Sequence, residues 1–248
     1  MLRAFLILLT LTLPAHAEEV VAGLSQSRIS ISTNFDGSEI LIFGAVKRDA
    51  PPGTSPLQVL ITVEGPSEPL TVRKKAKRFG IWVNTDRVEV TGAPSFYAVA
   101  TTAPLSDTIT DNQDLQHRIS IPRAIQLGGE RFPGDVAFEE ALIRIREDAG
   151  LYQTNIGAVS LEEGTLFSTT VRLPANLHEG DYRARFFLTR NGVVVDQHST
   201  DIDVQKVGLE RFLFRLSREN PLIYGLMSLA IAIFAGWAAS AAFRALRV

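Results

Sequence analysis

The chain has 248 residues, a formal net charge of −2 at pH 7 and no cysteine, with 46% hydrophobic and 21% charged residues. This composition excludes a disordered chain, which has too few apolar residues, and a fully membrane-embedded protein, which has few charges. The near-neutral charge predicts no nucleic-acid partner, and the lack of cysteine excludes disulfides, iron–sulfur clusters and thiolate zinc sites.

Residues 1–17 have the pattern of a secretory signal peptide. Arg3 supplies the positive n-region, Ala4–Leu13 is an apolar run, and Ala15-His16-Ala17 offers the small residues that a signal peptidase accepts. This apolar run is too short to cross a bilayer as a helix. We therefore expect cleavage before Glu18, with an uncleaved anchor as the alternative, and export of the domain that follows.

Residues 18–104 are predicted to form a first antiparallel sandwich. Short runs rich in Ile, Leu and Val alternate with turn signals such as Asp36-Gly37 and Gly65-Pro66. Strands at this spacing are typical of immunoglobulin-like domains. The predicted strands are 28–33, 39–46, 57–64, 80–84, 87–91 and 96–101.

Residues 105–150 are predicted to be a helical insert. One helix in this segment is indicated by five apolar residues that share a face: Phe138, Ala141, Leu142, Ile145 and Ala149. Asp135 can cap its start and Gly150 its end.

Residues 151–207 return to strands and are predicted to form a second sandwich. The strands are 166–173, 181–190 and 193–204, and an Asn191-Gly192 turn joins the last two. Tyr182 resembles the tyrosine corner of immunoglobulin-like domains, which gives it a structural role. The expected fold is mainly β, with two immunoglobulin-like antiparallel sandwich domains, a helical insert and one C-terminal transmembrane α-helix.

The segment 222–243 is predicted to cross a membrane. It holds 22 residues without a charge, which make a helix of about 33 Å and match a hydrocarbon core of about 30 Å. A cleaved signal peptide places the N-terminal domain outside, so residues 244–248 are expected to form a cytoplasmic tail. The predicted location is the bacterial inner membrane, with the ectodomain in the periplasm.

Two further features surround this span. Residues 208–219 have the spacing of an amphipathic juxtamembrane helix lying at the headgroup level. Within the span, small residues recur every four positions and predict a helix-packing face, although spans are rich in small residues in any case. These residues are Ser228, Ala232, Gly236 and Ser240.

No sequence motif predicts catalysis, metal binding or a cofactor. The histidines after residue 17 are His117, His178 and His198, which are too far apart to form a metal-ligand motif. No nucleophile elbow, phosphate-binding loop or dinucleotide fingerprint is present. We therefore expect no catalytic, metal or cofactor-binding residues and a protein that is not an enzyme.

The strongest local charge feature has five cations in six residues: Arg73, Lys74, Lys75, Lys77 and Arg78. Three interpretations stay open for it. It is a solvated loop or edge strand, a contact with anionic headgroups or an acidic partner loop, or an anion-binding site. The nearby Trp82 is expected in the core, with a partner-facing anchor as the alternative.

Several stretches together resemble a family of single-span transmembrane proteins of alphaproteobacteria that has no assigned activity. They include Asn34-Phe35-Asp36-Gly37, Gly80-Ile81-Trp82-Val83-Asn84, Leu173-Pro174-Ala175-Asn176 and Tyr224-Gly225-Leu226. The resemblance implies a signal-bearing protein with one span and a β-rich periplasmic ectodomain. Because family members tend to be encoded beside permeases resembling sulfite or organosulfonate exporters, it also implies such a permease as a partner. No catalytic residues carry over.

These features predict an accessory or interaction protein, anchored in the inner membrane and facing the periplasm. Its expected partners are the membrane and an integral membrane protein, or a second copy of the chain through the span. The alternative is a periplasmic binding module for a small anion or a sulfur-containing solute.

Overall fold

The computed structural model describes residues 18–32, 35–48, 55–128, 134–207 and 209–246. The predicted signal peptide lies outside these residues, as does the end of the predicted cytoplasmic tail. The chain forms two units: one contains Asp36–Val204 and the residues up to Ile29, and the other contains Ser30–Phe35 and Gln205–Val248.

The first unit consists mostly of strands. They are β1 (Glu18–Leu24), β2 (Arg28–Ile31), β3 (Ser38–Arg48), β4 (Leu57–Glu64), β5 (Ser67–Arg78), β6 (Ile81–Pro94), β7 (Tyr97–Thr101), β8 (Gln126–Leu127), β9 (Tyr152–Asn155), β10 (Ser160–Glu162), β11 (Leu166–Leu173), β12 (Gly180–Arg190) and β13 (Val193–Lys206). The helices of this unit are α2 (Leu105–Thr108), α3 (Asp111–His117), α4 (Ile121–Ala124) and α5 (Asp135–Asp148).

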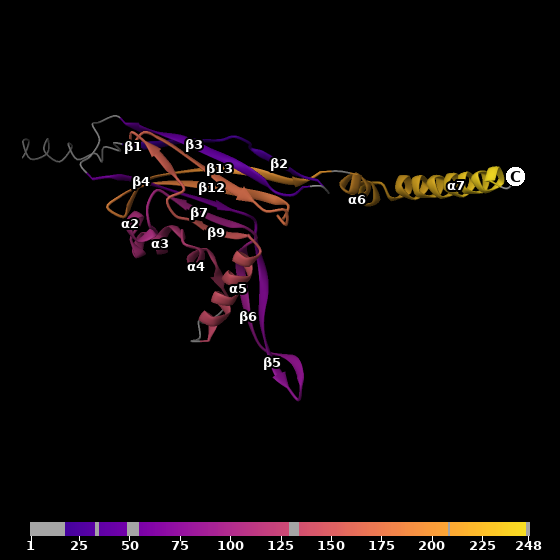
Figure 1. Cartoon of the computed structure of the whole chain (residues 1–248), viewed down its shortest axis with the longest axis horizontal. Helices are drawn as coiled ribbons and strands as arrows, with labels where there is room; N and C mark the ends of the chain where they lie inside the picture. Colours follow the sequence, from indigo (N-terminus) through magenta and orange to yellow (C-terminus); the bar gives the residue numbers. More distant parts are fainter. Residues whose placement is uncertain (1–17, 33–34, 49–54, 129–133, 208, 247–248) are drawn as a thin grey trace, which may run out of the picture. The chain divides into compact units, whose positions relative to one another are not determined.

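These strands form three sheets (Figure 1). Sheet A has the order β1-β3-β11-β10, sheet B the order β2-β13-β12-β4-β7-β9, and sheet C the order β5-β6-β8. The β7–β9 pair is parallel, whereas β4 is antiparallel to both β7 and β12. The prediction of a mainly β chain with antiparallel sheets and one C-terminal apolar helix is confirmed.

Strands from the two predicted sandwich regions share both large sheets. Strand β3 pairs with β11, with Ile42 opposite Thr169, and β4 pairs with β12, with Ile61 opposite Phe186. This corrects the expectation of separate sandwiches over 18–104 and 151–207. The alternation of apolar residues shows which face of a strand is buried, but not which strand lies beside it.

Sheets A and B pack their inner faces together. Phe167 of β11 and Phe186 of β12 are fully buried, and their ring centroids lie 6.2 Å apart. Gly44 of β3 makes this packing possible, because a Cβ there would lie 2.4 Å from Cζ of Phe167 and 2.6 Å from the carbonyl oxygen of Val21. Each fully buried phenylalanine contributes about 2 to 3 kcal/mol of stability.

Helices cover the outer face of sheet B. Leu60 of β4 and Phe187 of β12 are opposite each other and form a buried cluster with Ile109 and Ile119 from the helical segment. Strand β4 is therefore buried on both faces, which explains why its sequence is almost continuously apolar. Helix α5 matches the predicted helix near residues 135–149.

The second unit contains the ends of β2 and β13, together with α6 (Leu209–Glu219) and α7 (Pro221–Leu246). Helix α6 coincides with the predicted juxtamembrane helix. Helix α7 has 26 residues, of which Pro221–Ala242 are long and apolar enough to cross a membrane. None of that apolar stretch is buried by the rest of the chain, so its side chains are free to face lipid or another helix.

Candidate functional site

Strands β5 and β6 form a long antiparallel hairpin whose tip extends away from the rest of its unit, while helix α5 contacts β5 (Figure 1). At the base, β6 pairs with β8 at Val90 and Gly92. At the tip, the turn residues Phe79 and Gly80 have φ values of 50° and 85°, as a two-residue mirror-image turn requires. The basic segment 73–78 lies in strand β5 and is not a loop, because it pairs along its whole length with β6.

Pairing gives this hairpin two different faces. The half-buried apolar face carries the pairs Leu70–Val90, Val72–Val88 and Ala76–Val83, and the exposed cationic face carries Arg73–Arg87, Lys75–Asn84 and Lys77–Trp82. Arg87 is thus a member of the cationic face that local sequence could not reveal. Only the register of the hairpin, which includes an irregularity between Lys74 and Lys75, places it opposite Arg73.

The cations of β5 are exposed, and among them Lys74 has an acidic residue, Asp86, opposite it on β6. Within the part of the chain that the structure describes, none of the five forms an ion pair. Like charges that face each other directly across two strands destabilise the pair. The Arg73–Arg87 pair therefore gives the hairpin no stability of its own.

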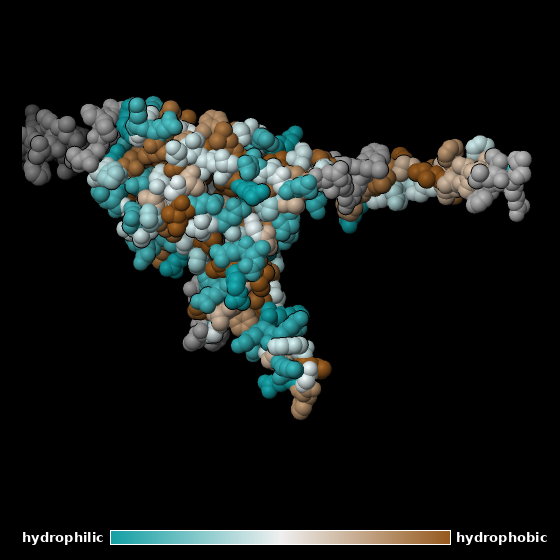
Figure 2. All heavy atoms as spheres, in the orientation of Figure 1, coloured by the Kyte–Doolittle hydropathy of each residue, from teal (hydrophilic) through white to brown (hydrophobic). Residues whose placement is uncertain are grey.

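The tip of the hairpin is apolar, and Figure 2 shows brown at its end. Phe79, Ile81 and Trp82 are 106%, 65% and 68% exposed. The prediction that Trp82 belongs to the core is wrong, because Trp82 pairs with Lys77 on the cationic face, near the free end of the hairpin. The alternative, an anchor that faces a partner, is consistent with this exposure.

An open hollow of about 400 Å³ lies on the same hairpin, lined by Arg73, Asn84, Thr85, Asp86 and Arg87. Thr85 is the extra residue at the irregularity in the register, and its hydroxyl donates to Oδ2 of Asp86 at 3.0 Å. The two arginines have the charge and geometry to bind an oxyanion here, whereas the negative charge of the Asp86 carboxylate repels an oxyanion.

The four small residues of the predicted helix-packing face all lie on α7. Ser228 donates its hydroxyl to the Tyr224 carbonyl at 2.9 Å, within the helix. A Cβ added to Gly236 would meet nothing within 4 Å. The stripe is therefore open in the isolated chain.

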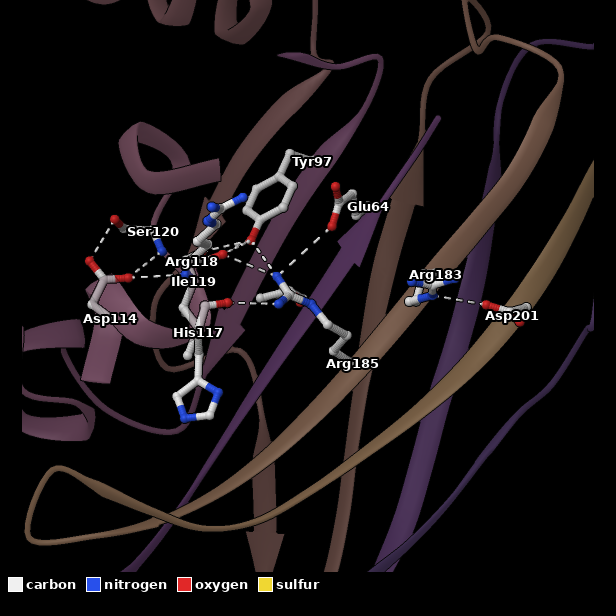
Figure 3. Close-up of polar contacts among 11 residues, drawn as sticks. Glu64, Tyr97, Asp114, His117, Arg118, Ile119, Ser120, Arg183, Arg185 and Asp201 are labelled. Atoms are coloured by element: carbon white, nitrogen blue, oxygen red, sulfur yellow. Dashed lines mark hydrogen bonds and ion pairs between the residues drawn. The ribbon is translucent and has the colours of Figure 1, made fainter. Parts of the chain in front are cut away.

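A separate polar cluster joins the helical segment to sheet B (Figure 3). Arg185 donates to the His117 carbonyl at 2.8 Å and to the Tyr97 hydroxyl at 3.1 Å, and Tyr97 in turn donates to the Ile119 carbonyl at 2.9 Å. Burial raises the pKa of Tyr97 well above its usual range, so the hydroxyl stays protonated. These contacts join the helical segment to sheet B.

Tyr182 is buried in the core, and its hydroxyl donates to the His178 carbonyl at 2.9 Å. This bond back to the chain a few residues upstream is the contact that a tyrosine corner makes. As for metals, the described residues contain no group of three or more His, Asp or Glu side chains placed to hold an ion.

Comparison with known proteins identifies the family. The family described as "Putative transmembrane protein (Alph_Pro_TM)" matches residues 19–245, nearly the whole chain. The chain belongs to this family. Its membrane location is thereby shown, together with a single candidate span among the described residues, and the predicted family resemblance is confirmed.

One similar solved structure is that of Spo0M, a sporulation control protein from Bacillus subtilis. The two chains are 14% identical, with a TM-score of 0.28, and the match covers 81% of this chain and 55% of that chain. The chain thus spans about half the length of Spo0M, and the likeness is too distant to indicate a shared function. No curated protein matches the sequence.

Proposed function

We infer that this protein is a membrane-anchored interaction protein, not an enzyme, and that it engages its partner through the β5–β6 hairpin. The observation that carries this proposal is the exposed cationic face with Trp82 beside it. Exposed like charges such as the Arg73–Arg87 pair raise the free energy of the isolated chain. An anionic surface would remove that cost and add attraction.

The proposed orientation places the hairpin in the periplasm and the C-terminus in the cytoplasm, with the span in the bacterial inner membrane. The signal-peptide pattern before Glu18 and the C-terminal span support it. Because the chain has no cysteine, a single introduced cysteine reports its own accessibility. A membrane-impermeant maleimide should label Lys75→Cys in intact spheroplasts and Val248→Cys only after permeabilisation. The reverse pattern would overturn the orientation.

The proposed partner is an integral membrane protein, for which the permease implied by the family resemblance is the first candidate. A photocrosslinking amino acid in place of Trp82 should capture it in native membranes. The same amino acid in place of Ile156, which is 58% exposed but lies away from the hairpin in sequence, is the control. Equal captures at both positions, or none at Trp82, would refute docking of a protein on the tip of the hairpin.

A second candidate function is a binding module for small oxyanions at the hollow beside Arg73 and Arg87. A ligand that binds only the folded state raises the melting temperature. Sulfate, phosphate or an alkyl sulfonate should therefore stabilise the full chain in detergent, and Arg87→Gln should abolish the shift. This candidate function fails if none of these anions raises the melting temperature of the wild-type chain at a concentration at which chloride has no effect.

A further inference from the structure

The turn residue Phe79 is unfavourable in two ways for the chain alone. Its side chain is fully exposed, and its φ of 50° lies in the left-handed region, which bulky residues rarely adopt. Asn or Gly would suit this position in a two-residue turn better. Phe79 therefore contributes neither to the core nor to the turn, so any favourable contact it makes lies outside the chain.

The two residues after the turn extend this apolar tip. Ile81 and Trp82 are both mostly exposed and follow Gly80 on the same free end. The tip is the free end of the hairpin, and its residues line none of the three hollows described for this chain. A convex apolar end is suited to insertion into a lipid layer. Tryptophan in particular favours the membrane–water interface.

Two cations lie beside the apolar residues of the tip. Arg78 and Lys77 are opposite Ile81 and Trp82, one and two residues from Phe79. At about 3.3 Å per residue they lie within about 7 Å of it, close to the thickness of one headgroup layer, about 5 to 8 Å. When Phe79 reaches the hydrocarbon boundary, these two cations are at the depth of the lipid phosphates.

The backbone of the hairpin can also enter this layer at little cost. From Leu70 to Arg78 the residues of β5 are paired with β6, which satisfies about half of the backbone hydrogen-bonding groups of each strand. The outward-facing groups of both strands can bond to water and to lipid headgroups, so the hairpin enters the headgroup layer and not the hydrocarbon core. The remaining cations lie farther back. Lys75 and Lys74 are within about 10 Å of the phosphates, about one Debye length, whereas Arg73 and Arg87 are about 13 Å away, where the surface potential is largely screened.

We propose that the tip of the β5–β6 hairpin inserts into the headgroup region of an anionic bilayer. Phe79 enters the boundary of the acyl chains, Ile81 and Trp82 lie in the interfacial layer just above it, and Arg78 and Lys77, which are opposite them, bind lipid phosphates. This inference rests on the proposed function of the hairpin as the interaction surface of the chain. It assigns the apolar tip to a lipid surface, so that an integral membrane partner meets the chain beside the inserted tip. A bilayer is always present, because α7 keeps the chain in a membrane.

The test uses the full chain with Trp237→Phe, which leaves Trp82 as the only tryptophan. This chain is placed in nanodiscs of phosphatidylcholine with or without phosphatidylglycerol. Separately, phosphatidylcholine nanodiscs are mixed with vesicles that contain phosphatidylglycerol. Lipids brominated on their acyl chains quench tryptophan at short range, so they report insertion into the same bilayer or into a second one.

With phosphatidylglycerol, we expect the Trp82 emission to shift to shorter wavelength and to be quenched by brominated lipid. Phe79→Asn should abolish the quenching while amide exchange shows the hairpin intact, because Asn-Gly favours this turn. Replacing Lys77 or Arg78 by Ser should weaken vesicle binding about fivefold each.

If Trp82 stays accessible to aqueous iodide in every lipid arrangement, insertion is refuted. In that case, protein capture by the crosslinker at Trp82 would leave the proposed function standing, with an acidic protein surface as the partner. Failure of both measurements would refute the proposed function as well.

Discussion

Arg190 holds Glu18 through two hydrogen bonds: Nε donates to Oε2 at 2.9 Å and Nη2 to Oε1 at 2.6 Å. Their side chains are only 15% and 9% exposed, and Arg48 adds a third bond to Glu18 from its Nε at 2.9 Å. Glu18 begins β1 in sheet A, and Arg190 ends β12 in sheet B. The pair therefore links the two sheets at the start of β1 and the end of β12.

This pair makes the free energy of unfolding depend on pH in the acidic range. The hydrogen bond from Arg190 is the main reason why the pKa of Glu18 lies below its usual value of 4.5. The pair therefore stabilises the fold above that pH and loses its contribution as the pH falls through the folded-state pKa. We expect Glu18→Gln to lower the free energy of unfolding by about 2 to 3 kcal/mol at pH 7 and to flatten its acid dependence.

Glu19→Gln is the matched control for that experiment. Glu19 pairs with Lys47 at 3.1 Å, but both side chains are about 60% exposed, so the change should cost less than about 1 kcal/mol. Thermal unfolding in detergent at neutral and acidic pH measures both variants. Equal losses for the two would contradict the role given to Glu18.

Alkaline pH should destabilise the first unit through its buried tyrosines. Burial raises the pKa of Tyr152 to about 12, and its hydroxyl donates to the Pro94 carbonyl at 2.9 Å. Burial also raises the pKa of Tyr182. A raised pKa stabilises the fold below the unfolded value of about 10, and this stability is lost as the pH rises from there toward 12.

Tyrosinate absorbance and circular dichroism should therefore change together above about pH 10. Tyr152→Phe should reduce the steepness of the alkaline transition, because one titrating group is removed. Titration of all the tyrosines near pH 10 in a chain that remains folded would contradict this expectation.

Two arginines on β12 should differ sharply although they lie two residues apart (Figure 3). Arg185 is 15% exposed and bonds to the helical segment and to Tyr97, whereas Arg183 forms an exposed pair with Asp201. Arg185→Gln should cost about 2 to 3 kcal/mol, and Arg183→Gln less than about 1 kcal/mol. Amide exchange over residues 105–124 should rise only for Arg185→Gln.

Gly236→Leu should weaken helix association without harming the chain itself. A side chain at this position meets nothing within 4 Å in the isolated chain, so any loss of association reports on the helix that packs there. Ala238→Leu, about half a helical turn away, is the control. Chemical crosslinking in membranes should show fewer adducts for Gly236→Leu alone, and unchanged adducts would exclude this packing face.

Local sequence signals predicted many of the elements. The predicted bounds of β4 and β11 agree with the structure, and the Asn191-Gly192 turn adopts positive φ values of 50° and 74°. These features depend on residues that are neighbours in the chain. Apolar alternation and turn chemistry act over the same short range, so the sequence reports them directly.

The candidate site was only partly predictable. The five cations of β5 and Trp82 stand out in the sequence, and Phe79 and Ile81 lie beside them. The sequence did not show that the basic segment is a strand or that Trp82 is exposed. Both depend on the pairing of β5 with β6. No local sequence pattern shows how far along this hairpin other parts of the chain cover it.

By itself, the sequence determined the transmembrane segment, because 22 uncharged residues match the bilayer whatever the rest of the chain does. It also determined the β-rich class and the existence of a basic segment. Only the tertiary structure decided that β3 pairs with β11 and β4 with β12, that Arg190 binds Glu18 across 172 positions, and that Arg87 joins Arg73. These partners are distant in the chain, and their choice depends on the packing of all the strands at once.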